Sequence, residues 1–128
     1  MTQLEFIEQI IKEKEAVILD ANDKIWSYAE LPYEETRSSA LLCSILESEG
    51  FTVETGVAEI PTAFVARYVV GTGKPVMGIL GEFDALATLS QKAGCTVKDP
   101  VQNGGSGHGC GHCCLGTGAL AAALAVKE

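Results

Sequence analysis

The sequence predicts an α/β fold in which helices pack on a mixed sheet, and three observations support this class. Two segments near the start, residues 2–30 and 34–49, place apolar side chains at helical spacing. Between residues 51 and 80 the pattern changes to alternation and short apolar runs, which are typical of strands. After a glycine-rich stretch, residues 113–127 are rich in alanine and leucine and predict a third helix that packs closely against the sheet.

The first two helices have recognisable signals at their ends. Thr2 and Glu5 form a predicted capping box at the start of the first helix. Pro32 stops that helix, so we expect it to end near Glu30. The second helix is expected over residues 34–49, with Gly50 as its C-terminal cap.

The strands are predicted from their alternation and their turns. Residues 51–57 and 62–70 alternate like half-buried strands, and Gly and Pro in residues 71–75 predict a turn. Residues 75–80 are apolar at nearly every position, which predicts a strand covered on both faces. Such a strand needs neighbours on both sides. We therefore expect residues 1–128 to be an incomplete, N-terminal portion of a larger catalytic domain.

Composition excludes several classes of partner. The chain has 128 residues, 47% of them hydrophobic, and a net charge of -8. An acidic chain is poorly suited to bind nucleic acid or an anionic membrane. The sequence shows no secretory signal, and its longest apolar run, residues 119–126, is too short to cross a bilayer. Five cysteines without such a signal favour a reducing, cytoplasmic location without disulfides.

Residues 81–111 form a long predicted loop, and two clusters of metal-binding side chains lie at its ends. Connections of this length are usually functional. In the second cluster, His108, Cys110 and His112 alternate with glycines just before the third helix. Thiolate and imidazole are ligands of zinc and related ions. The N-terminus of a helix also favours a thiolate or a metal-bound hydroxide.

The first cluster follows the apolar run directly. Glu82 and Asp84 are two residues apart, so an extended backbone places both carboxylates on one side. The C-terminal end of a strand is where α/β folds position ligands and catalytic groups. Carboxylates combined with Cys and His from a nearby loop suit a hydrolytic metal site.

These two motifs together resemble those of the metallo-amidohydrolases related to aminoacylase and indole-acetyl-amino-acid hydrolase. The paired motifs are Gly81-Glu82-Phe83-Asp84-Ala85-Leu86 and Gly107-His108-Gly109-Cys110-Gly111-His112. Residues 24–30, 89–94 and 115–123 are similar as well, so the resemblance covers essentially the whole chain. It implies the N-terminal part of a metallopeptidase-like catalytic domain, without the lid domain.

The resemblance also implies roles for individual residues. Cys110 and His112 would bind the metal, and Asp84, the candidate catalytic residue, would support the metal site and its histidine ligands. Glu82 stands where distant relatives carry a ligand histidine, which makes it either an additional ligand or a residue behind the ligands. His108 would lie behind the ligands.

The function implied by the resemblance is hydrolysis of an amide bond in N-acyl or N-aroyl amino acids, with p-aminobenzoyl-glutamate as the leading small-molecule substrate. The cofactor would be zinc or manganese, in a two-metal site of the complete enzyme, which would be a homo-oligomer or a hetero-oligomer. The family's general base, a glutamate, and its remaining ligands lie downstream of this region. We therefore expect the isolated chain to be inactive.

The chain departs from the family pattern at two places. Ala87 replaces a usual Pro, and Cys113-Cys114 replaces Asn or Asp followed by an apolar residue. The additional thiols are potential competitors for metal.

Other interpretations of the same residues stay open. Cys110 and Cys113 form a C-x-x-C run, as in thiol–disulfide oxidoreductases, although those proteins usually carry an aromatic residue before the first Cys. A phosphate-binding loop is disfavoured because no Lys follows the glycines. A structural zinc site would use Cys110, His112, Cys113 and Cys114. A non-catalytic fragment or subunit is the remaining alternative.

Overall fold

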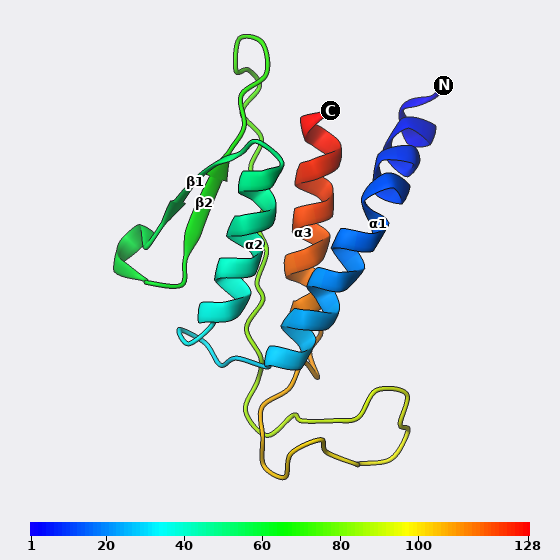
Figure 1. The fold of residues 1–128 in the computed structure, drawn as a ribbon, viewed down its shortest axis with the longest axis vertical. Coiled ribbons are helices and arrows are strands. Elements are labelled where there is room, and N and C mark those ends of the chain that lie inside the picture. The colour runs from blue at the N-terminus through cyan, green and yellow to red at the C-terminus, as the bar shows by residue number, and fades with distance from the viewer.

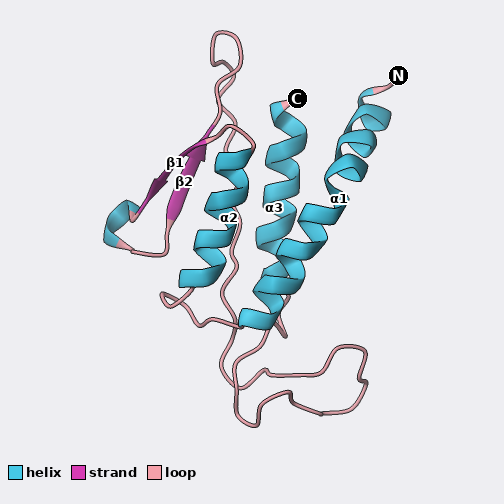
Figure 2. Ribbon diagram, in the orientation of Figure 1, coloured by secondary structure: helices cyan, strands magenta, loops and turns pink.

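A computed structural model describes all 128 residues and contains three helices and one two-stranded sheet (Figures 1 and 2). The α/β class is confirmed, but the sheet is antiparallel rather than mixed. In chain order the elements are α1 (Gln3–Tyr28), α2 (Thr36–Ser48), β1 (Thr52–Thr55), a short 3-10 helix (Val57–Glu59), β2 (Phe64–Arg67) and α3 (His112–Lys127). No helix combines the length and the apolarity that crossing a membrane requires.

The capping box at the start of α1 is confirmed. The Glu5 backbone N–H donates to Thr2 Oγ1 at 3.2 Å, and the Thr2 backbone N–H donates to Glu5 Oε2 at 2.7 Å. The helix ends at Tyr28, two residues before the predicted end, where Ala29 adopts a left-handed conformation with φ 46°. The chain therefore turns towards α2 before it reaches Pro32.

Glu30 connects the end of α1 to the start of α2. Its carboxylate accepts hydrogen bonds from the backbone N–H groups of Arg37 (3.0 Å) and Ser38 (2.9 Å), and from the Ser38 hydroxyl (2.7 Å). Burial alone would raise the pKa of Glu30, but these donors outweigh it and lower the pKa. Glu30 thus provides the N-terminal cap of α2 from outside the helix.

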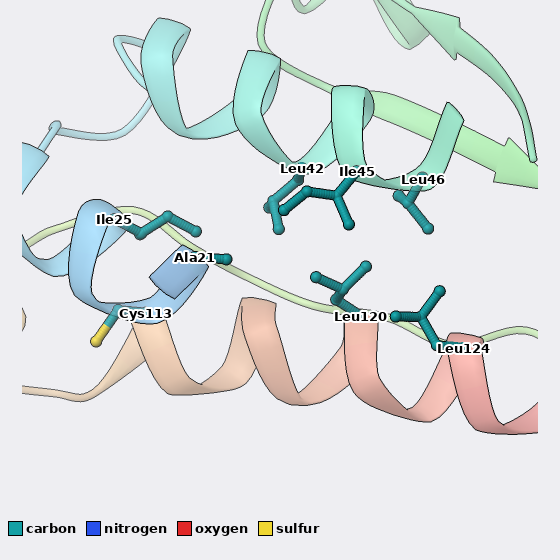
Figure 3. Packing of buried hydrophobic residues seen from close by; sticks show 8 residues of the cluster. All are labelled: Ala21, Ile25, Leu42, Ile45, Leu46, Cys113, Leu120 and Leu124. Atoms are coloured by element: carbon teal, nitrogen blue, oxygen red, sulfur yellow. The ribbon is translucent and has the colours of Figure 1, made fainter. Parts of the chain in front are cut away.

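The hydrophobic core lies between the three helices (Figure 3). Leu42, Ile45 and Leu46 of α2 face Leu120 and Leu124 of α3, with α1 beside them. The whole cluster comprises Ala21, Ile25, Leu42, Ile45, Leu46, Cys113, Leu120 and Leu124. The alanine-rich helix α3 therefore packs on helices, and the expectation that it packs against a sheet is wrong.

Strands β1 and β2 are shorter than predicted. They pair antiparallel from Thr52 opposite Arg67 to Thr55 opposite Phe64, four residues each. Phe64 and Ala66 of β2 and Val53 of β1 are partly buried against the core cluster. The sheet thus adds one half-covered layer beside α2 (Figure 2).

The prediction of a buried strand over residues 75–80 is wrong. This segment forms no strand, and no backbone hydrogen bond joins residues 74–84 to a neighbouring strand. The side chains of Val76 and Leu80 are 89% and 98% exposed. The segment is apolar enough for a core strand, but no other segment of this chain lies beside it to supply the hydrogen bonds and the cover.

Candidate metal centre

Two glycines bring the segment after residue 80 close to the first turns of α3. A Cβ atom on Gly81 would lie 2.7 Å from the Ala119 Cβ, and one on Gly116 would lie 2.8 Å from the Phe83 Cβ. Only glycine permits this approach of an extended backbone to a helix. The crossing carries Glu82 past the N-terminal half of α3.

The long loop after this crossing is held by a few backbone contacts. Leu86 and Gly107 exchange two hydrogen bonds of 3.0 Å, which pair the outgoing and returning limbs of the loop. The buried Ala85 donates its N–H to the Glu30 carbonyl at 2.7 Å, and the Ser106 hydroxyl donates to the Ala29 carbonyl. The loop, otherwise irregular as predicted, is thereby anchored to the end of α1 (Figure 1).

Glu82, Asp84 and His112 come together at the start of α3. One donor atom from each lies within 4.8 Å of the others, which is the spacing of a set that can share one cation. His112 Nδ1 lies 2.9 Å from Asp84 Oδ1, and His112 Nε2 lies 3.4 Å from Glu82 Oε2. His112 and Asp84 are largely buried, with side-chain exposures of 15% and 20%, whereas Glu82 is 70% exposed.

The two contacts of His112 differ in kind. The Asp84 contact has hydrogen-bond length, so an Nδ1–H that donates to the carboxylate fixes the ring and leaves Nε2 with its lone pair. Nε2 then faces Glu82, the more exposed of the two carboxylates. An imidazole oriented by one carboxylate, with its free nitrogen beside another, is the arrangement found around metal-binding histidines.

His108 lies next to this group but uses both ring nitrogens elsewhere. Its Nε2 lies 3.1 Å from the Ile25 carbonyl oxygen, and its Nδ1 accepts the Cys113 backbone N–H at 3.2 Å. A carbonyl accepts only, so Nε2 carries the proton. Burial lowers the pKa of His108, which keeps the ring neutral. His108 therefore joins α1, the loop and α3.

The three cysteines beside His112 have different environments. Cys110 is exposed and does not belong to the group formed by Glu82, Asp84 and His112. Cys113 is buried, and burial raises the pKa of its thiol to about 11. A thiol–disulfide oxidoreductase needs an accessible thiolate at neutral pH, so Cys113 is poorly suited to the C-x-x-C role considered above.

Leu89 has a positioning role that the sequence did not indicate. A Cβ atom on Gly109 would lie 2.9 Å from Leu89 Cδ1, and one on Gly107 would clash with the Leu89 backbone. The alternating glycines do signal a close approach, but not which distant residue makes it. Next to this contact, an open cavity of about 320 Å³ lies between the end of α1 and the loop, with Trp26 and His108 in its wall.

Comparisons with known proteins agree with the motifs. The chain is 50% identical over 123 residues to one subunit of the p-aminobenzoyl-glutamate hydrolase of Escherichia coli (strain K12), which covers 96% of this chain and 25% of that protein. It is 30% identical over 112 residues to thermostable carboxypeptidases 1 and 2 of Saccharolobus solfataricus, covering 88% of this chain and 28% of each. No family model matches the chain.

The resemblance stated from the motifs is thus confirmed, and the relatives are hydrolases. The chain spans about a quarter of the length of these curated relatives.

Proposed function

We propose that this chain supplies part of the metal centre of an amidohydrolase that cleaves N-acyl or N-aroyl amino acids. The observation that carries the proposal is the group of Glu82, Asp84 and His112, which unites the two separated motifs within 4.8 Å. The names of the relatives support hydrolysis, and that of the Escherichia coli protein makes p-aminobenzoyl-glutamate the first substrate to test.

The donor set fits a divalent ion of the zinc or manganese type, since imidazole and carboxylate oxygen suit both. When bound, such an ion polarises the substrate carbonyl and lowers the pKa of a coordinated water. His112 Nε2 and Glu82 would hold the ion, while Asp84 orients the His112 ring. We assign Cys110 as a further, thiolate ligand, because it lies two residues from His112 on the same loop.

This chain holds too few ligands for the proposed activity. It contains two histidines, and His108 is engaged at both nitrogens. A two-metal site and a general base therefore require residues from further polypeptide, as part of the same chain or as a second subunit. We propose that the 128 residues alone bind metal but do not turn over substrate.

Partners and location follow from the same features. A small cavity beside Trp26 suits a small molecule rather than nucleic acid, and the net charge of -8 opposes phosphate binding. All five cysteines are free, which is compatible with the proposed reducing cytoplasm.

A chimaera tests the function. This chain would replace the matching quarter of the Escherichia coli protein, and the purified chimaera would be assayed with p-aminobenzoyl-glutamate and Zn²⁺ or Mn²⁺, together with any further polypeptide that the enzyme requires. We expect hydrolysis that a chelator stops and that His112→Ala reduces by more than about 100-fold.

The matched control is Asp23→Asn, an exposed residue of α1, which leaves the rate unchanged. A folded chimaera that hydrolyses the substrate equally well with Ala at position 112 would refute the metal role of His112. A folded, metal-loaded chimaera without activity would refute the proposed reaction.

A further inference from the structure

Cys113 and Cys114 place two thiols side by side at the beginning of α3. Their Sγ atoms are 3.9 Å apart. The separation is nearly twice the length of a disulfide bond, about 2.05 Å, so both thiols are reduced. Neither sulfur belongs to the group formed by Glu82, Asp84 and His112, and the function proposed above uses neither.

The local structure fixes one sulfur and exposes the other. The Cys113 backbone N–H is bonded to His108 Nδ1, and the residue is 3% exposed. Figure 3 shows Cys113 at the end of the core cluster, with its sulfur directed away from Leu120 and Leu124. Cys114 is exposed. A ligand can therefore reach the pair from the side of Cys114.

The spacing suits two bonds to one thiophilic atom. Two sulfurs bound to one centre at about 2.3 Å, with a tetrahedral angle, are about 3.8 Å apart. The Sγ separation of 3.9 Å is already close to this value. We propose that Cys113 and Cys114 form a dithiol site for trivalent arsenic species, separate from the carboxylate and imidazole donors.

The reaction with a trivalent arsenical needs no oxidant. In the case of phenylarsine oxide, two arsenic–sulfur bonds form, while the arsenic–oxygen bond and two S–H bonds break. The oxygen leaves as water with both thiol protons, and arsenic keeps its oxidation state. The condensation therefore proceeds from the protonated thiols, as the buried Cys113 presents.

The test uses the reduced 128-residue chain and phenylarsine oxide, followed by intact mass and by counting of free thiols. We expect one phenylarsenic group per chain and the loss of two of the five thiols. The adduct should survive excess monothiol and be removed by a dithiol, because both bonds must break together. Prior addition of Mn²⁺, which prefers oxygen and nitrogen ligands, should leave the stoichiometry unchanged.

Single substitutions identify the sulfurs. Cys114→Ser should make the adduct at least roughly 100-fold easier to displace by monothiol, because one bond remains. Cys113→Ala should do the same, whereas Cys43→Ser, Cys95→Ser and Cys110→Ser should not. Since Cys114 is exposed, its variant is expected to fold, and it decides the matter if Cys113→Ala does not. A monothiol-resistant adduct in Cys114→Ser, or its loss in Cys110→Ser, would overturn the proposal.

Discussion

His112 Nδ1 lies 2.9 Å from Asp84 Oδ1, although the two residues are 28 positions apart in the sequence. The contact joins the segment that crosses α3 to the first residue of α3 itself. It also turns Nε2 towards Glu82, 3.4 Å away. The geometry of the candidate metal centre therefore depends on this one pair.

Replacing Asp84 by Asn should weaken metal binding without removing either of the proposed ligands His112 and Glu82. The amide cannot stabilise the Nδ1–H as a carboxylate does, so we expect the affinity for Zn²⁺ to fall by about 10- to 100-fold. Titration calorimetry of the purified chain measures the change. Asp23→Asn is the control, and equal affinities for the two variants would show that Asp84 has no positioning role.

Two glycines of α3 form a matched pair. An added Cβ would meet Phe83 at Gly116 but open space at Gly118. We expect Gly118→Ala to raise the free energy of unfolding by up to about 1 kcal/mol, because alanine favours the helix. Gly116→Ala should lower it by about 1–3 kcal/mol and also weaken Zn²⁺ binding, because residues 82–84 must move. Urea unfolding would measure both, and stabilisation by both variants would contradict the close crossing.

The helices were predictable because their signals are local. The Thr2–Glu5 capping box and the apolar spacing act within a few residues, and the three helices form within two residues of the predicted ends. The strand over residues 75–80 failed for the opposite reason. An apolar run indicates a need for burial, but the neighbouring strands that satisfy it are not encoded locally.

The candidate site was predictable in part. Alternation correctly placed Glu82 and Asp84 near one partner, and that partner is His112. The pairing of His112 with Cys110 on one ion stays a prediction. No local pattern indicated that Leu89 would occupy the space left by Gly107 and Gly109, since such contacts depend on the path of a long loop.

His108 should make stability depend on pH near neutrality. Burial lowers its pKa below the ordinary 6.5, so the unfolded chain gains a proton more readily than the folded one. The stabilisation is complete above about pH 6.5 and is lost as the pH falls through the folded pKa. Urea unfolding at several values between about pH 7.5 and 5 should show this decline, and His108→Gln should flatten it. An unchanged slope in that variant would assign the effect to other groups.

Glu30 should be worth more than an ordinary exposed carboxylate. Glu30→Gln removes the charge that accepts bonds from Arg37 and Ser38, and we expect a loss of about 1–3 kcal/mol in the free energy of unfolding. The pKa of Glu30 is lowered on folding, so the difference from wild type should shrink as the pH falls below about 4.5 through the folded pKa. Glu34→Gln, exposed and four residues away, is the control for thermal and urea unfolding. Equal effects of the two changes would remove the capping role.

The unpaired apolar segment should make the isolated chain associate at high concentration. Val76 and Leu80 are exposed, and the backbone between them has no strand beside it, which is the combination that promotes pairing between chains. We expect Leu80→Lys to lower the weight-average mass measured by sedimentation, without a change in the free energy of unfolding, because the side chain is 98% exposed. Val97→Lys, exposed on the long loop, should have no such effect. If both variants associate as the wild type does, the contact between chains lies elsewhere.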